Sequence, residues 1–202
     1  MHYIIQLIIL IFSAIVHEVM HGVAAEKLGD DTARLEGRIT LNPIPHIDPF
    51  GSIALPLFLM MVGSPVILGA AKPVPVNFNN LRDPKRGMAL VSLAGPLANF
   101  GLAILCVIPI KLGLVNQLSY EILIQAIIIN LVLGTFNLIP IPPLDGSKVL
   151  AAMAPDRWMY KILEWERFGF LIVFAFLYLG LLDRILWPVV LWFSRIFGLG
   201  LY

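Results

Sequence analysis

Long apolar stretches constrain the fold of this chain more than any other feature of its sequence. Residues 3–25, 88–110 and 120–139 are each apolar and long enough for a helix that crosses the hydrocarbon core of a bilayer, which is about 30 Å thick. Only 13% of the 202 residues are charged, against about a quarter in soluble domains. The sequence therefore predicts an all-α polytopic membrane protein, with residues 1–202 forming a single domain, and argues against a soluble globular fold.

The remaining apolar stretches are less regular. Residues 168–182 are short for a crossing and need their flanks to complete it, and residues 185–202 are interrupted by Pro188, so they either cross or lie in the interface. Residues 51–71 are long enough to cross, but a Gly-Ser-Pro break in their middle can turn the chain back. We expect a compact bundle of about four to six membrane segments, one of them re-entrant or a hairpin.

A cluster of polar residues lies in the second half of the first apolar stretch. On a helix, His17 and His21 are one turn apart on one face, so both imidazoles can bind the same metal ion. Glu18 lies between them and can reach a water on that metal, as in the His-Glu-x-x-His motif of zinc hydrolases. Polar side chains in a membrane segment are costly unless they pair or bind something, which favours a metal site over a chance occurrence.

A third metal ligand is needed, because catalytic zinc usually has three protein ligands and a water. Asp145 follows the third long apolar stretch. Three prolines in four positions unwind the helix there, and one leucine separates them from Asp145. Unwound backbone at membrane depth is tolerated where it lines a cavity or packs within protein. Asp145 is therefore either the third ligand or an interfacial residue that caps the helix beginning near Ser147.

Three motifs together carry a resemblance to a known family. The motif from His17 to His21, the Gly-Pro-Leu-Ala-Asn sequence that ends at Asn99, and the Asn-x-x-Pro and Leu-Asp-Gly elements between Asn137 and Gly146 resemble the site-2 protease family of intramembrane zinc metalloproteases. The similarity covers roughly residues 10–150. The chain is similar to a minimal member of that family, without a PDZ domain.

The resemblance implies a cofactor, a fold and a set of site residues. It implies one Zn²⁺ per chain and a core of three helices that cuts a transmembrane peptide. The implied zinc ligands are His17, His21 and Asp145, with Glu18 as the general base. It also implies that Asn99 and Asn137 lie near the substrate or its oxyanion, although either amide could instead hold helices together.

Two classes of function remain to be distinguished. The leading one is an intramembrane zinc metalloprotease that hydrolyses peptide bonds in or next to transmembrane segments of membrane proteins. The alternative is a non-proteolytic metal-binding membrane protein, such as a transporter or scaffold, which has no need of the carboxylate of Glu18. The expected partners are a transmembrane protein or peptide substrate and the lipid bilayer. A net charge of +1 gives no reason to expect nucleic acid, and the sequence leaves the oligomeric state open.

The polar stretches between the apolar ones contribute further expectations. Pro73–Val76 has two prolines, so it is extended, and it either pairs with an extended substrate or forms a plain loop. We expect short β-strands of this kind near the active site. His46 and Asp48 lie in a proline-rich turn and either orient a ligand histidine or stabilise that turn.

The position of the metal site also constrains the topology. His17 and His21 lie in the second half of their stretch and Asp145 follows the end of its own, so the two stretches must run in the same direction. If residues 51–71 also crossed, Asp145 would end on the opposite face, about 30 Å away. We therefore expect residues 51–71 to enter and leave on one side.

The charges indicate which side that is. Without a crossing at residues 51–71, eleven Lys and Arg residues share one side, and only Lys111 and Arg184 clearly face the other, with Arg195 undecided. The positive-inside rule makes the shared side cytoplasmic. We expect a multi-pass protein of a prokaryotic cell membrane, with its active site nearer the cytoplasmic face.

Overall fold

The computed structural model describes residues 2–54, 61 and 71–200 of the chain. Most of the apolar stretch 51–71 lies outside these described residues. Our expectation that this stretch turns back without crossing the membrane therefore stays a prediction.

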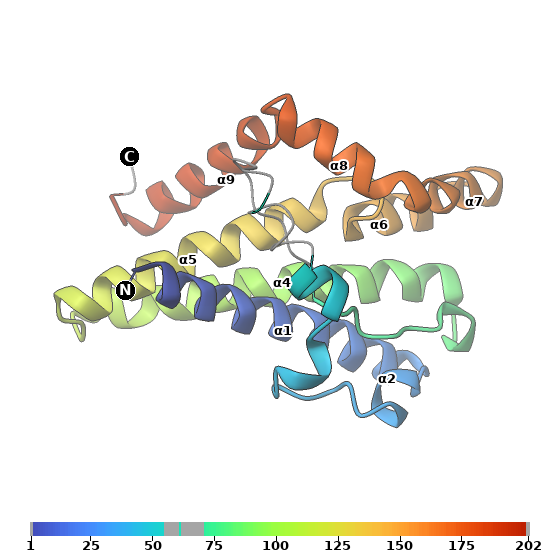
Figure 1. Cartoon of the computed structure of the whole chain (residues 1–202), viewed down its shortest axis with the longest axis horizontal. Coiled ribbons are helices and arrows are strands. Elements are labelled where there is room, and N and C mark those ends of the chain that lie inside the picture. Colours follow the sequence, from blue (N-terminus) through green and yellow to red (C-terminus); the bar gives the residue numbers. More distant parts are fainter. Residues whose placement is uncertain (1, 55–60, 62–70, 201–202) are drawn as a thin grey trace.

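Three long helices form the centre of the molecule. Helices α1 (His2–Leu28), α4 (Pro84–Lys111) and α5 (Gln117–Leu138) pack against one another, and each is long and apolar enough to cross a membrane. Helices α1 and α5 run in the same direction and α4 runs in the opposite one (Figure 1). Helices α1 and α4 extend the stretches 3–25 and 88–110 slightly at both ends, whereas α5 begins before the stretch 120–139 and ends just short of residue 139.

Local sequence signals define where the second and third long helices begin. The Asp83 side chain accepts a hydrogen bond from the backbone amide of Arg86, and Pro84 occupies the first turn of α4, where it costs no backbone hydrogen bond. Asn116 and Ser119 form a reciprocal capping box at the start of α5. Each helix is therefore fixed in register by residues that satisfy its first backbone amides.

Shorter helices cover one face of the three long ones. Helix α9 packs against α5, and side chains of α4, α5 and α9 form an apolar core that includes Ala103, Ile127, Leu131 and Val190. The other elements are α2 (Thr32–Leu35), α6 (Asp145–Met153), α7 (Asp156–Glu164), α8 (Gly169–Tyr178), α9 (Leu181–Phe197), the 3₁₀ turns η1 (Ile44–His46), η3 (Phe78–Asn80) and η4 (Trp165–Phe168), and the π-helical turn η2 (Pro49–Ala54).

The C-terminal apolar region breaks at a different residue from the one we expected. Helix α9 continues through Pro188, so this proline does not interrupt it. The break falls at Gly180, whose φ of 63° lies in the left-handed region that ends a helix, and α8 and α9 meet there at 76°. The bent pair counts as a fourth crossing if it forms one span, so the expectation of four to six segments stays a prediction.

The short β-strands that we expected near the active site are absent from the described residues. The segment Lys72–Asn77 is extended, as its prolines require, but it has no strand partner there. Its backbone groups are instead bonded by side chains, as described below. The segment is extended as expected, but it is not a strand, because an extended chain becomes a strand only when a neighbouring chain completes the hydrogen-bond ladder.

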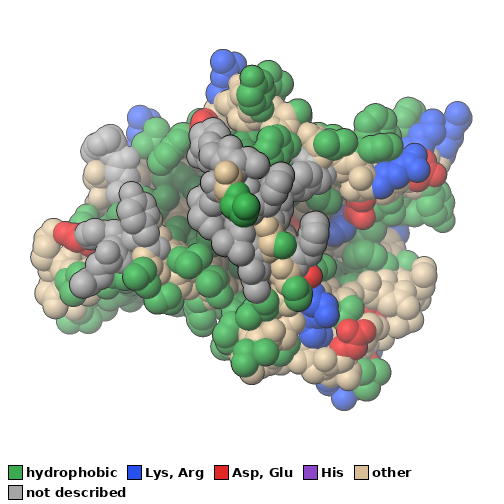
Figure 2. Space-filling model, viewed as in Figure 1, with side chains coloured by type: hydrophobic (Ala, Val, Ile, Leu, Met, Phe, Trp, Pro, Cys, Tyr) green, Lys and Arg blue, Asp and Glu red, His purple; other side chains and the backbone are tan. Residues whose placement is uncertain are grey.

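The surface is divided between an apolar part and a basic end. Hydrophobic side chains cover much of the visible face along α1 and α5, whereas many Lys and Arg side chains lie toward the end that carries α2 and α7 (Figure 2). Large apolar side chains of α1, including Ile4, Ile8 and Phe12, are exposed. Such a surface is suited to the hydrocarbon core of a bilayer, which makes the chain an integral membrane protein.

Candidate active site

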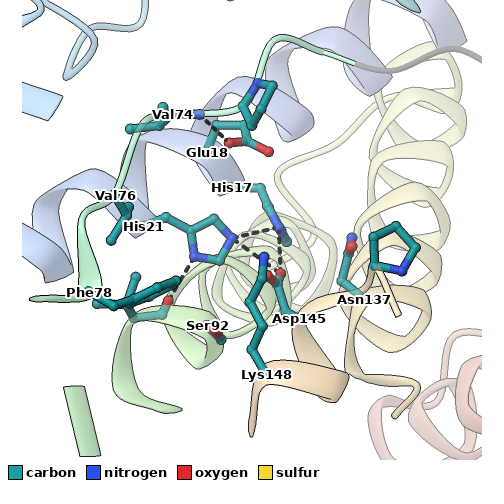
Figure 3. A pocket seen from close by; sticks show the side chains of 13 residues that line it. His17, Glu18, His21, Val74, Val76, Phe78, Ser92, Asn137, Asp145 and Lys148 are labelled. Atoms are coloured by element: carbon teal, nitrogen blue, oxygen red, sulfur yellow. Dashed lines mark hydrogen bonds and ion pairs between the residues drawn. The ribbon is translucent and has the colours of Figure 1, made fainter. Parts of the chain in front are cut away.

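Three side chains from two distant parts of the chain meet between α1 and α6. Nε2 of His17 lies 3.0 Å from Nε2 of His21, and Oδ2 of Asp145 lies 3.1 Å and 3.2 Å from these two nitrogens (Figure 3). Tetrahedral zinc with bonds of about 2.0–2.1 Å separates its ligand atoms by about 3.3–3.4 Å. The three atoms are therefore spaced closely enough to hold one metal ion, and all three residues are buried.

The far nitrogen of each imidazole has a hydrogen-bond acceptor. Nδ1 of His17 lies 2.7 Å from Oδ1 of Asn99, and Nδ1 of His21 lies 2.7 Å from the backbone carbonyl of Val91. Both acceptors require a proton on Nδ1, which leaves the lone pair of Nε2 pointing toward the other ligands. The surroundings therefore select the tautomer that a metal needs.

The chain reverses sharply to bring Asp145 to the histidines. Asp145 is in the first turn of α6, which folds back onto the end of α5. A Cβ atom at Gly146 would lie 2.2 Å from the carbonyl oxygen of Leu138, so only glycine permits this approach. Burial raises the pKa of the Asp145 carboxyl, but its hydrogen bonds and charge interactions with His17 and His21 hold that pKa well below its usual range.

A glycine of α4 forms what we call the floor of the site. A Cβ atom at Gly95 would lie 2.5 Å from Nε2 of His21 and 2.7 Å from Nε2 of His17. The α4 backbone at this position thus approaches the metal-binding atoms as closely as a helix can. The backbone of α4 at Gly95 therefore packs directly against the two histidine rings.

The extended segment Lys72–Asn77, which we call the roof, lies across the opposite side of the site. The backbone amide of Val74 donates a 2.8 Å hydrogen bond to Oε2 of Glu18. Nη2 of Arg38 donates to the carbonyls of Lys72 and Pro73, at 2.9 Å and 3.2 Å. These bonds place the carboxylate of Glu18 at the edge of the cavity, beside the histidines but outside the ligand set (Figure 3).

Two further residues fix the ends of the roof. The carboxylate of Asp30 accepts a 2.7 Å bond from the amide of Asn77 and also bonds Thr32 and Asn80. At the other end, the carbonyl of His46 accepts a 2.9 Å bond from the amide of Lys72. The imidazole of His46 donates to the carbonyl of Thr40. His46 therefore stabilises a turn that carries the roof, and it does not orient a ligand histidine.

A cavity of about 260 Å³ opens beside the three ligands, between the roof and α6. Asn137 lines it, and so do Ser92 and Lys148, which sequence reasoning did not single out (Figure 3). The expected place of Asn137 near the substrate stays a prediction. Asn99 does not line it. Asn99 is fully buried, and its amide bonds His17, Ser13 and Asn130, so it has no group directed to a substrate.

Sequence reasoning missed the partners of Asn99. Ser13 and Asn130 are buried polar residues in α1 and α5, and each is hydrogen-bonded to the Asn99 network. A single serine or asparagine in an apolar stretch belongs to no spaced motif that would identify it as part of a site. The one available signal was the cost of an amide in a membrane helix, which applies to Asn130 as much as to Asn99.

Three buried side chains that could hold a metal ion lie beside the carboxylate of Glu18, among helices long enough to cross a membrane. This combination is typical of an intramembrane metalloenzyme. Comparison with known proteins agrees. The profile of peptidase family M50 matches residues 110–180. YwhC of Bacillus subtilis is 37% identical over 192 residues, which cover 91% of this chain and 84% of that protein.

Other relatives extend the similarity to further bacteria and to archaea. Rip2 of Mycolicibacterium smegmatis is 29% identical over 199 residues, covering 95% of this chain and 73% of that protein. A protein named zinc metalloprotease MJ0392, from Methanocaldococcus jannaschii, is 28% identical over 153 residues, covering 76% of this chain and 35% of that longer protein. No solved structure has a significant match. The chain belongs to peptidase family M50, the site-2 protease family of zinc metalloproteases.

Proposed function

We propose that this protein hydrolyses peptide bonds in or next to the transmembrane segments of other membrane proteins, with His17, His21 and Asp145 as its zinc ligands and Glu18 as the general base. The observation that carries the proposal is the position of Glu18. Its carboxylate lies beside the ligand set, lines the same cavity and is held there by the amide of Val74. A carboxylate kept off the metal is what a hydrolase needs and a transporter does not.

A zinc ion held by His17, His21 and Asp145 would polarise the carbonyl of the peptide bond and would lower the pKa of a water bound to it toward 7. Glu18 takes a proton from the attacking water and passes it to the nitrogen of the leaving amine. Asn137 lies in the cavity lining, with its Nδ2 bonded to the carbonyl of Leu133, so its remaining polar groups are placed to contact the substrate backbone. A helical substrate must unwind locally, because its own hydrogen bonds shield the bond that is cut.

The direct test separates metal binding from proton transfer. We expect purified Glu18→Gln to retain one zinc per chain and to lose activity by roughly 10²–10⁴ or more, because the base is not a ligand. His17→Ala and Asp145→Ala should lose both zinc and activity. Zinc is counted by mass spectrometry, and activity is measured on quenched-fluorescence transmembrane peptides in proteoliposomes. Full zinc in both ligand variants, or wild-type activity in Glu18→Gln, would contradict the assignment.

We also propose that residues 51–71 do not cross the membrane and that the site lies nearer the cytoplasmic face of a prokaryotic cell membrane. Two hydrogen bonds support this topology. The amide of Lys72 donates to the carbonyl of His46, so the chain leaves the stretch where it entered, and the amide of Arg82 donates to the carbonyl of Leu28 at 3.1 Å. Helix α4 therefore starts beside the end of α1, at the end of the molecule where many basic side chains gather (Figure 2).

Impermeant thiol reagents test the topology. Single cysteines at Ser52 and Asn79, in a Cys106→Ala background, should both be labelled from the cytoplasmic side of oriented membrane vesicles. A cysteine at Leu114, in the loop between α4 and α5, is the matched control and should be labelled from the other side. Labelling of Ser52 and Asn79 from opposite sides would mean that the stretch crosses.

A further inference from the structure

A chain of hydrogen bonds runs from the metal site into the interior of the bundle. It begins at Nδ1 of His17, which lies 2.7 Å from Oδ1 of Asn99. Nδ2 of Asn99 donates to the carbonyl of Ser13 at 3.2 Å and to Oδ1 of Asn130 at 2.9 Å. Nδ2 of Asn130 donates to the hydroxyl of Ser13 and to the carbonyl of Ala126, both at 2.9 Å. Helices α1, α4 and α5 each contribute to this chain.

Backbone carbonyls determine the direction of every bond in the network. A carbonyl oxygen can only accept, so the carbonyl of Ser13 requires the NH₂ group of Asn99 on its side, and that of Ala126 requires the NH₂ group of Asn130. Both amides are thereby oriented without ambiguity, with their oxygens directed to the next donor. The oxygen of Asn99 then faces His17, and only a protonated Nδ1 satisfies it.

The network is buried well enough for its geometry to matter. The exposed fractions of Ser13, Asn99 and Asn130 are 1%, 0% and 2%. In a low-dielectric interior an unpaired amide is costly in free energy. Each of these three side chains is therefore kept in its hydrogen-bonded orientation. His21 offers an internal comparison, because its Nδ1 bonds a backbone carbonyl that no side-chain substitution removes. Of the two histidines, only His17 has a side chain, that of Asn99, as the acceptor for its Nδ1.

We propose that Asn99, supported by Asn130 and Ser13, is a positioning residue that fixes the tautomer and ring orientation of His17 and thereby sets zinc affinity. This inference rests on the proposed zinc site. Asn99 is fully buried and does not line the cavity, and it acts through His17. The polar chain also makes zinc affinity depend on the packing of the three membrane helices, because a shift of α5 moves Asn130 and with it the amide of Asn99.

The experiment measures zinc affinity, not activity. Apo protein in detergent is titrated with zinc against a chelator of known affinity. We expect Asn99→Ala to weaken binding by about 10–100-fold, the usual effect of removing the hydrogen-bond partner of a ligand histidine. Asn99→Asp keeps an acceptor oxygen for Nδ1 of His17 but loses the donors to Ser13 and Asn130, so its affinity should lie between those of wild type and Asn99→Ala. Asn130→Ala, which leaves His17 and Asn99 in place, should weaken binding by a few-fold.

The matched control is Asn137→Ala. Asn137, like Asn130, is an amide of α5, but it lies in the cavity lining and its Nδ2 bonds the carbonyl of Leu133, so its removal should leave zinc affinity unchanged. A Co²⁺ spectrum gives a second readout, because a tilted His17 ring changes the ligand field, whereas a loss of stability alone does not. We expect an altered spectrum for Asn99→Ala and a wild-type spectrum for Asn137→Ala.

The outcomes separate this inference from the proposed function. If wild-type protein binds no zinc, the proposed site is wrong. If wild type binds zinc and Asn99→Ala binds it equally well, or if Asn137→Ala is weakened to the same degree as Asn99→Ala, the positioning role is overturned. Should Asn99→Ala fail to fold, wild-type zinc affinity in Asn130→Ala overturns the inference instead.

Discussion

The floor and the roof of the site are built by different means. The floor is the backbone of α4 at Gly95, which lies within a continuous helix. The roof, Lys72–Asn77, is an extended chain with no strand partner among the described residues. Charged side chains bond it instead, with Arg38 at one end, Glu18 near the middle and Asp30 at the other end.

From this difference we expect the two parts to affect different steps of the proposed reaction. The floor lies against the Nε2 atoms of His17 and His21, so a change there should alter what the site can bind. The roof lines the cavity, and its hydrogen bonds with side chains go to Arg38, Glu18 and Asp30. A change in the roof should therefore leave the metal in place and disturb proton transfer and substrate access. Paired substitutions can test each half of this comparison.

The largest effect on zinc content and activity should follow when a methyl group is added at Gly95, in the floor. We expect Gly95→Ala to lose zinc and all proteolytic activity, because the new Cβ would lie 2.5 Å from Nε2 of His21. Gly101 lies on the same helix, and a Cβ there would have no atom within 4 Å. Gly101→Ala should therefore keep zinc and gain up to about 1 kcal/mol of stability from its better helix propensity. Zinc counting and thermal unfolding measure both.

Two results would contradict the expected difference between Gly95→Ala and Gly101→Ala. A full zinc content in Gly95→Ala would mean that α4 can move away from the histidines and is no rigid floor. Equal zinc loss in Gly101→Ala would mean that any alanine in α4 disturbs the bundle.

The same contrast shows what could be predicted from the sequence. The three long helices follow from apolar length, and the approach of His17 to His21 follows from their one-turn spacing. The proline break before Asp145 left its role open, and only the family resemblance implied that it joins the histidines. The closeness of Gly95 to the histidines could not be predicted, because it depends on how α4 packs against α1. The same holds for Ser13 and Asn130, whose partners are 31 to 117 residues away in the chain.

The roof shows a different limit of sequence reasoning. Two prolines predicted an extended segment, which is present, but also suggested a strand, which is absent from the described residues. The hydrogen bonds that replace the ladder come from Arg38 and Asp30, which lie more than thirty residues upstream of the groups they bond. No periodic pattern records such a contact. Composition can predict backbone conformation, but the partners of that backbone are a tertiary property.

A smaller effect should follow when the roof is loosened at its first end. We expect Arg38→Ala to keep one zinc per chain and to cut proteolysis by about tenfold, because two charge-assisted hydrogen bonds to the roof are lost and Val74 no longer holds Glu18 firmly. Arg34 is the matched control. Its ion pairs with Glu26 and Asp31 are solvent-exposed, and exposed pairs contribute little.

Both variants are compared by zinc content and by the rate on the same peptide. Loss of zinc in Arg38→Ala would show that the roof also supports the metal and that the two regions are not separate. A tenfold loss of rate in Arg34→Ala would remove the special role of Arg38.

The smallest effect concerns the second end of the roof and appears only in acid. Burial raises the pKa of Asp30, but hydrogen bonds from Thr32, Asn80 and Asn77 lower it by more, so the pKa of this carboxyl lies below its ordinary value. A carboxyl with a lowered pKa stabilises the folded state at pH values above its unfolded pKa of about 3.9, and this contribution is lost as the pH falls through the folded pKa.

We therefore expect Asp30→Asn to reduce stability by about 1–2 kcal/mol at neutral pH, since the amide accepts fewer of these bonds and turns a donor toward one of them. The difference in Tm between wild type and Asp30→Asn should be constant from pH 7 to about pH 5 and should shrink below about pH 4, because only the wild-type carboxyl is neutralised there. Thermal unfolding in detergent across this range measures it, with Asp31→Asn, an exposed neighbour, as the control. A Tm difference that stays constant down to pH 3 would mean that the charge of Asp30 does not stabilise the roof. The distinction between a helical floor and a roof bonded by charged side chains would then not hold at this end of the roof.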